Sequence, residues 1–218
     1  AYGHGAIHIA KVLIENGINF LAVATLSEAI ELRNVGYEVP IIILGYTPVE
    51  QGDLLIEYNI IQTIYNYEQA IHFSRIAKNS KQAITVHIKI DTGMSRLGFQ
   101  TTDEDFKSIK KILSMDYLQV QGIYTHFAMA DEKDKSFTYE QYSRFTDLIS
   151  KLERDGYNIP IKHVSNSAAI IDLPEMNLDM VRAGIMLYGL YPSEEISKER
   201  ISLKPVMALK TTVSHVKT

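Results

Sequence analysis

The sequence predicts an α/β fold, a TIM-like (β/α)8 barrel that lacks its first strand and is followed by the start of a β-rich C-terminal domain. Short apolar runs rich in β-branched residues recur along the chain, and most are separated by segments with the period of an amphipathic helix. Strands that alternate with helices indicate parallel βαβ units. The runs are regularly spaced, and several carry polar residues on one face, as a barrel interior can use near its mouth. These features favour the barrel over the open doubly wound sheet, which is the competing architecture.

Seven strands are expected in the chain. They lie at 20–24, 41–44, 60–64, 84–90, 118–125, 161–164 and 178–181. The chain opens on a loop that leads into a helix over 5–16, and an eighth strand just before the first residue would complete the barrel.

The helices between the strands are recognised by their ends. Thr25 and Glu28 have the spacing of a capping box, and Gly36 is placed to end the helix that they begin. Asn66 precedes a second apolar-periodic segment as a candidate cap, and Gly156 follows the longest one.

The strand at 84–90 shows the alternation best. Its even-numbered positions are isoleucine or valine and should meet the helices. Its odd-numbered positions are Thr85, His87 and Lys89, and Asp91 continues the same alternation just after the strand. These four side chains are expected to point into the predicted barrel.

The pattern changes after Pro192. The segment 203–217 has the character of a strand, and no helix follows it. We therefore expect the barrel domain over residues 1–198 and the beginning of a second, β-rich domain over 199–218.

Composition excludes several classes of function. The 218 residues carry a formal net charge of −4, which argues against nucleic acid or an anionic membrane as the main partner. The absence of cysteine excludes a thiol nucleophile and fits a reducing compartment. No apolar run reaches the length of a membrane span and no signal peptide is present, so we expect a cytoplasmic segment, either of a soluble protein or of a membrane-anchored one. The chain starts without methionine inside a motif, as an excised piece would.

Two loops at the mouth of the predicted barrel suit a phosphate group. In such barrels phosphate is usually bound by the loops after strands seven and eight, which here are 163–169 and 182–185 if the expected first strand is counted. The first loop offers the Ser167 hydroxyl and free backbone N–H groups, and the second offers Gly184, which lets the backbone approach an anion. Each loop alone fits an ordinary cap or turn, but together they favour a phosphate-bearing ligand.

Two cations stand out near the same mouth. Lys89 points inward, where a buried ammonium needs a partner or must lose its charge, and Asp91 is the nearest candidate partner. Arg96 lies in the loop that leaves this strand, and its planar fork suits a carboxylate or phenolate oxygen.

Three other signals lead to no site. His4 and His8 have the spacing of a metal-binding pair, but no acidic residue completes the set, so no metal is expected. Gly3 and Gly5 begin a glycine pattern that no third glycine completes, which excludes a dinucleotide fingerprint. No GxSxG nucleophile motif is present.

Five motifs together resemble the alanine racemase family, in the same order and over the whole chain. In this sequence they read AYGHG at 1–5, DTGMSRLG at 91–98, YTHFA at 124–128, NSAA at 166–169 and RAGIMLYG at 182–189. Many family members have proline where this chain has Ala183, which suggests a divergent branch, and the serine racemases linked to glycopeptide resistance are one such branch.

The resemblance implies a cradle for pyridoxal 5'-phosphate. The residues that match phosphate contacts are Tyr2, Ser167, Gly184 and Ile185, with Asn166 beside them. Leu44 matches an apolar residue against the cofactor ring, and Arg182 matches the arginine that faces the pyridine nitrogen. His126 and His163 match histidines in the network around that arginine.

The resemblance also implies residues for catalysis and substrate binding. Arg96, Lys89 and His126 are the candidate catalytic residues. Arg96 matches the arginine that orients the cofactor phenolate and the substrate carboxylate, and Lys89 matches a lysine that many members carry as a carbamate. Asp131 matches a residue along the substrate entrance.

The activity implied is racemisation of L- and D-alanine through an external aldimine, which supplies D-amino acid for peptidoglycan. The lysine that binds the cofactor would fall just before the first residue, and a tyrosine from the second domain of a partner subunit would be the other base, so a homodimer is implied. Serine as the substrate, a non-catalytic protein that manages the cofactor supply and an amino-acid decarboxylase remain alternatives.

Overall fold

One parallel sheet of six strands organises the structure, and each strand pairs with its neighbours in the sequence. The computed structural model describes residues 1–217. The strands are β1 (Leu21–Val23), β2 (Ile41–Ile43), β3 (Ile61–Ile64), β4 (Ile84–Lys89), β5 (Leu118–Tyr124) and β6 (Ile161–His163).

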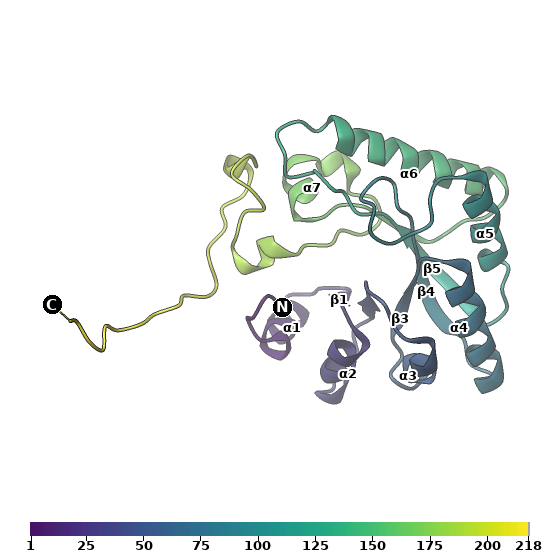
Figure 1. The fold of residues 1–218 in the computed structure, drawn as a ribbon, viewed down its shortest axis with the longest axis horizontal. Coiled ribbons are helices and arrows are strands. Elements are labelled where there is room, and N and C mark those ends of the chain that lie inside the picture. The colour runs from purple at the N-terminus through teal and green to yellow at the C-terminus, as the bar shows by residue number, and fades with distance from the viewer. Residues whose placement is uncertain (218) are drawn as a thin grey trace.

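Helices alternate with the strands and form an arc around them (Figure 1). They are α1 (Ala6–Glu15), α2 (Leu26–Asn34), α3 (Gly52–Glu57), α4 (Tyr67–Ser80), α5 (Asp103–Leu113), α6 (Ser136–Arg154) and α7 (Ser167–Asp172). Short 3₁₀ segments are η1 (Val49–Gln51), η2 (Pro174–Met176), η3 (Ile185–Tyr188) and η4 (Lys198–Arg200). The predicted α/β class with parallel βαβ units is confirmed.

The helix ends follow the local signals. Thr25 and Glu28 form both hydrogen bonds of the capping box at the start of α2. The Asn66 side chain accepts a hydrogen bond from the backbone N–H of Gln69, 2.8 Å away, at the start of α4. Gly36 and Gly156 follow α2 and α6 with φ of +87° each, a conformation that glycine adopts without strain.

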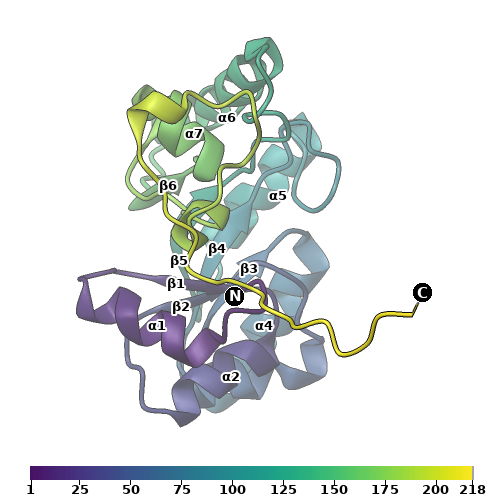
Figure 2. The ribbon, with the colours of Figure 1, turned by 90° about the vertical axis from the view of Figure 1, so that its left-hand side faces the viewer.

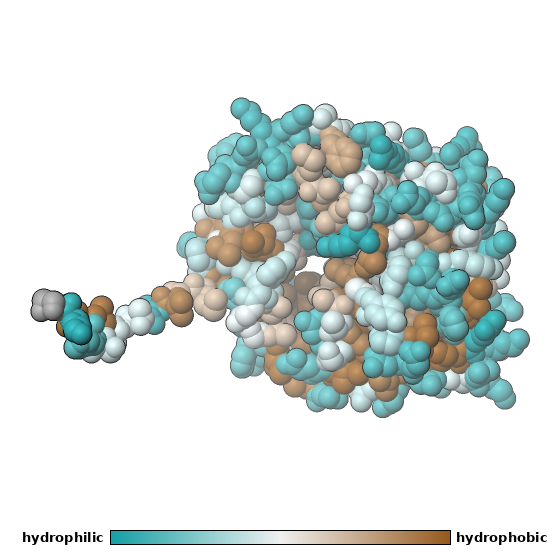
Figure 3. Space-filling model, in the orientation of Figure 1, coloured by the Kyte–Doolittle hydropathy of each residue, from teal (hydrophilic) through white to brown (hydrophobic). Residues whose placement is uncertain are grey.

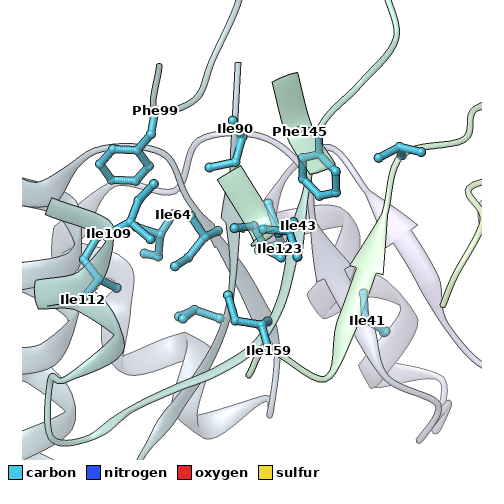
Figure 4. Close-up of a cluster of buried hydrophobic side chains, with 14 of the residues drawn as sticks. Ile41, Ile43, Ile64, Ile90, Phe99, Ile109, Ile112, Ile123, Phe145 and Ile159 are labelled. Atoms are coloured by element: carbon cyan, nitrogen blue, oxygen red, sulfur yellow. The ribbon is translucent and has the colours of Figure 1, made fainter. Parts of the chain in front are cut away.

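The core lies between the sheet and the helices. Figure 4 shows its centre, where isoleucines of β2, β3 and β5 meet Ile109 and Ile112 of α5 and Phe145 of α6. The predicted apolar row of β4 is fully buried, with Ile84, Val86 and Ile88 at most 2% exposed. The opposite row is buried as well, with His87 at 0% and Lys89 at 4% exposed. Polar side chains of β4 therefore lie buried on the inner face of the sheet.

The prediction of a strand at 178–181 is wrong. This segment runs beside β6 and donates backbone hydrogen bonds from Asp179 to Lys162 and from Arg182 to Ser165, each 3.0 Å long. The backbone N–H of Lys162 donates to the carboxylate of Asp179 instead of to a strand carbonyl. This side-chain acceptor replaces a ladder bond, so a regular strand does not form.

The prediction of a strand at 203–217 is also wrong within the described residues. Val206 donates a backbone hydrogen bond to Tyr188, but from there to residue 217 the segment is extended and unpaired. It leaves the folded body in two perpendicular views (Figures 1 and 2), and Leu209 is 99% exposed. A strand needs a neighbour to accept its hydrogen bonds, and residues 1–217 offer this segment none. Its assignment to a second domain stays a prediction.

Within residues 1–217, no helix combines the length and the apolar character that crossing a bilayer requires.

Candidate functional site

A cavity of about 1170 Å³ is lined both by β1 and by the segment 178–185, on the two edges of the sheet. Figure 3 shows the molecule hollowed near its centre, with hydrophobic residues in the depth of the hollow. Many of the candidate residues chosen from sequence line this one cavity. They are Tyr2, Leu44, His126, Asp131, Asn166, Ser167, Arg182, Gly184 and Ile185.

One corner of the cavity is built from the two predicted phosphate loops. The Ser167 hydroxyl accepts hydrogen bonds from the backbone N–H groups of Gly184, 2.9 Å away, and Met186, 3.4 Å away. A Cβ atom added at Gly184 would lie 3.6 Å from both the Ser167 hydroxyl and the Tyr2 hydroxyl. Two hydroxyl groups thus converge on an open position that only glycine leaves free.

Asn166 keeps this corner in shape. Its side-chain oxygen accepts from the N–H of Ala169, 3.1 Å away, at the start of α7, and its amide nitrogen donates to the carbonyl of Phe127, 3.4 Å away. Asn166 therefore joins the loop after β6 to the loop after β5.

Arg182 is the centre of a buried hydrogen-bond network. Its guanidinium donates to the carbonyl oxygens of Thr125 and Val164, 2.7 and 3.0 Å away, and to Nδ1 of His163 and of His126, 2.6 and 3.2 Å away. Its Nε atom is buried and has no acceptor among residues 1–217. An unsatisfied buried N–H costs about 1–3 kcal/mol, so this atom marks a place for a ligand acceptor.

The histidines around Arg182 are held neutral. Burial, and then the charge of Arg182, lowers the pKa of His126 to about 3 and holds the pKa of His163 well below its usual range. Burial lowers the pKa of Arg182 to about 10, so its guanidinium stays charged at neutral pH. One cation is therefore surrounded by neutral rings.

Lys89 lies on the inner face of β4 beside this network. Its ammonium donates to the carbonyl of Ile90, 2.9 Å away. The expectation that Asp91 pairs with it is wrong, because the Asp91 carboxylate accepts instead from the backbone N–H groups of Gly93 and Ser95, each 3.0 Å away. Burial, and then the charge of Arg182, lowers the pKa of Lys89 to about 7.

Tyr124 is a member of the network that sequence reasoning did not select. Its ring stacks on His163 with centroids 4.5 Å apart, and the charged groups of Lys89 and Arg182 lie 5.2 and 5.1 Å from its centre. Its hydroxyl is 3.0 Å from that of Thr63. The signal was alternation, since Tyr124 and His126 lie two positions apart at the end of the strand expected at 118–125 and so were expected on one face.

The remaining candidates lie at the rim or outside the cavity. Arg96 is exposed in the loop after β4, close enough for its charge to lower the pKa values of Lys89 and His126. Asp131 is half-buried, and its backbone oxygen accepts from the Ser193 hydroxyl, 2.6 Å away. Within residues 1–217 no group of three or more potential ligands gathers as a metal site.

The chain is similar to known proteins in sequence and in fold. The family model described as alanine racemase, N-terminal domain, matches residues 1–192. The chain belongs to the alanine racemase family. Residues 193–217, which include the exposed segment, lie beyond the part that this alanine racemase domain model matches.

Named alanine racemases are similar to the whole chain. Those of Clostridium tetani and Methanococcus maripaludis are 49% and 51% identical over 217 residues, which is 100% of this chain and 56% and 58% of those proteins. The solved alanine racemase of Clostridium difficile 630, in complex with cycloserine, has a TM-score of 0.96 and 46% identity and covers 100% of this chain and 60% of its own. The chain thus spans little more than half the length of these relatives.

Proposed function

We propose that this chain forms the cofactor-binding barrel of a racemase that interconverts L- and D-alanine with pyridoxal 5'-phosphate. The activity proposed is that of the whole protein, in which residues 1–198 form the barrel and residues 199–218 begin a second domain. The observation that carries the proposal is that one cavity is lined both by the corner where the Tyr2 and Ser167 hydroxyls converge and by Arg182, a half-buried arginine whose Nε–H is buried without an acceptor among residues 1–217.

The corner fits the phosphate of the cofactor. The hydroxyls of Tyr2 and Ser167 and the backbone of Gly184 and Ile185 would hold it, because all four residues line the cavity and the first three meet at one open position. A phosphate accepts hydrogen bonds from hydroxyl and N–H groups alike.

Arg182 fits the nitrogen of the cofactor ring. A guanidinium that keeps its proton can only donate, so the ring nitrogen opposite it would stay unprotonated. Leu44 would pack against the ring, and His126 and His163 would hold Arg182 in place. When bound, the cofactor makes the α-hydrogen of an amino acid acidic enough to be removed.

Substrate binding is assigned to the rim. The exposed guanidinium of Arg96 would bind the substrate carboxylate, with Lys89 behind it as the group that sets the local charge. Asp131 would lie along the entrance. The two bases that exchange the α-proton lie outside this chain, and the second would come from a partner subunit of a homodimer.

The test uses the full-length protein loaded with pyridoxal 5'-phosphate. We expect D-alanine to form from L-alanine, and the reverse, with exchange of the α-hydrogen for deuterium in heavy water. Faster turnover of serine would change the substrate but keep the reaction class. Cofactor binding without exchange of alanine or serine would contradict the racemase and favour a non-catalytic cofactor-binding protein.

A further inference from the structure

A third histidine extends the Arg182 network into the sheet. His87 lies on the inner face of β4 and is 0% exposed. Its Nδ1 is 2.9 Å from Nε2 of His163, and its Nε2 is 3.4 Å from the side-chain oxygen of Gln121. Together with Arg182, these residues form one continuous chain of contacts.

The direction of every bond in this chain is fixed by its arginine end. Guanidinium N–H groups only donate, so Nδ1 of His163, 2.6 Å away, must be the acceptor. A neutral imidazole carries one N–H, so His163 is protonated on Nε2 and donates to Nδ1 of His87. His87 is then also protonated on Nε2 and donates to Gln121.

A second proton on either ring is disfavoured by the same geometry. An N–H on Nδ1 of His163 would face the N–H of Arg182, and an N–H on Nδ1 of His87 would face that of His163. The other charged or titratable groups near these rings are Lys89 and Tyr124. Burial lowers the pKa of His87 to about 4, in agreement with a neutral ring.

The strands are shaped to admit the His87 ring. A Cβ atom at Gly122 would lie 2.5 Å from ring atoms of His87. Val86 pairs with Val120 but His87 pairs with Gly122, so Gln121 is an extra residue on β5. Such a bulge turns a side chain out of the regular alternation, and here it leaves Gln121 beside the imidazole and a glycine beneath it.

We propose that His87 is a positioning residue that holds His163 in its Nε2–H tautomer. In this tautomer the lone pair of Nδ1 faces Arg182 and fixes the guanidinium, whose Nε–H is left for the ligand. The tautomer follows from this chain alone. Only its consequence for turnover rests on the proposed function.

The first test is the protonation pattern of the wild-type, full-length protein. With ¹⁵N-labelled histidine, two-bond ¹H–¹⁵N correlations distinguish a ring nitrogen that carries hydrogen from one with a lone pair, and the signals lost in His163→Asn assign the His163 ring. We expect His87 and His163 to be protonated only on Nε2 at pH 7, with or without pyridoxal 5'-phosphate. A His163 ring protonated on Nδ1, or on both nitrogens, would overturn the proposal, and this result needs no variant of His87 to fold.

The second test distinguishes the hydrogen-bond acceptor that His87 supplies from the space that its ring fills. His87→Phe keeps a ring but removes the acceptor, whereas His87→Asn keeps an acceptor near the place of Nδ1 and removes the ring. In His87→Phe the Nε2–H of His163 would be left without an acceptor, whereas Arg182 would keep its bonds to the carbonyls of Thr125 and Val164 if it released Nδ1 of His163. We therefore expect a mixture of His163 tautomers in His87→Phe and the single Nε2–H form in His87→Asn. The exposed His72 supplies a control, because His72→Phe should leave the His163 signals unchanged.

Turnover gives the functional readout. Loss of a partner that orients a metal-bound histidine costs about 10- to 100-fold in activity. By analogy, kcat of the holoenzyme should fall roughly 10-fold in His87→Phe, with KM for alanine nearly unchanged, and recover in His87→Asn. A His163 tautomer unaltered by His87→Phe would contradict the proposal even if the wild type racemises alanine. A wild type that shows the expected tautomers without racemisation would contradict the proposed function instead.

Discussion

Lys89 is the residue at which burial and charge conflict most. Lys89 is 4% exposed and its ammonium is hydrogen-bonded to one backbone carbonyl. Burial and the charges of Arg182 and Arg96 lower its pKa, whereas the charge of Asp91 raises it. A pKa of about 7 leaves much of the amine neutral at neutral pH. A neutral amine is a nucleophile, and two nearby cations favour any change that makes this position negative.

We predict that Lys89 adds carbon dioxide. The amine nitrogen bonds to the carbon and releases one proton, which gives a carbamate anion between the two arginines. With ¹³C-bicarbonate at pH 8, the full-length protein should show a carbamate signal that Lys89→Met lacks and that the exposed Lys81→Met control retains. The signal should weaken as pH falls through about 7, because protonation removes the nucleophile. An identical spectrum for Lys89→Met would contradict this assignment.

For single residues, the sequence indicated candidate site residues where the fold puts a given function at a fixed place. Counting strands selected Ser167 and Gly184, because phosphate loops of barrels occur at fixed places. The structure brings these two residues together at one corner of the cavity, although the strand counted at 178–181 does not form. The contact of His87 with His163 could not be found in this way, since the two residues are 76 positions apart and meet only through the curvature of the sheet. The sequence also did not reveal that Asp91 does not pair with Lys89. Its carboxylate accepts hydrogen bonds from backbone N–H groups of the following loop, whose conformation the sequence pattern does not show.

Among the elements, α6 positions the loop that carries His126. The buried Gln141 side chain accepts from the N–H of Ala128, 2.9 Å away, and donates to the carbonyl of His126 and the hydroxyl of Thr92, each 3.2 Å away. One amide thus satisfies both backbone groups of a loop that has no regular partner.

Replacing Gln141 with leucine should loosen this loop. The N–H of Ala128 would be buried without an acceptor, at a cost of about 1–3 kcal/mol. Urea unfolding of the full-length protein should show a loss of this size for Gln141→Leu and almost none for Gln82→Leu, which alters an exposed glutamine. Equal stability of the two variants would show that α6 does not hold the loop.

Sequence signals predicted the helix starts well, because both residues of a helix cap lie on the same short segment. The caps at Thr25 and Asn66 are examples, since each involves residues three positions apart. The segment 178–181 has the apolar pattern of a strand, but whether it forms one depends on its neighbour. There the N–H of Lys162 donates to the carboxylate of Asp179 and not to a backbone carbonyl. The sequence of 178–181 alone does not show which acceptor the neighbouring strand will use.

For the whole molecule, the buried histidines predict loss of stability in mild acid. Burial lowers the folded-state pKa of His87 to about 4 and of His126 to about 3, and that of His163 also lies well below normal, whereas the unfolded value is about 6.5. Between these values the unfolded chain binds more protons, so stability is present above about pH 6.5 and is lost as pH falls below it.

Each histidine contributes a slope of about 1.4 kcal/mol per pH unit in this range. Urea unfolding of the cofactor-free protein between pH 7.5 and 5.5 should show a free energy of unfolding that declines as the pH falls. His126→Asn should reduce the slope of this decline by the contribution of one histidine. A stability that does not change over this range would contradict the neutral histidines.

The central claim is that the cavity is built for a phosphorylated pyridoxal. The most direct measurement compares the dissociation constants of pyridoxal 5'-phosphate and pyridoxal for the full-length protein and for Ser167→Ala, with the exposed Ser80→Ala as the control. Loss of a hydrogen bond to a charged group costs about 1.5–3 kcal/mol, so Ser167→Ala should bind the phosphorylated form roughly 10- to 100-fold more weakly. Pyridoxal binding should barely change, and Ser80→Ala should match the wild type. An equal loss of affinity for both compounds, or no loss for either, would contradict the account.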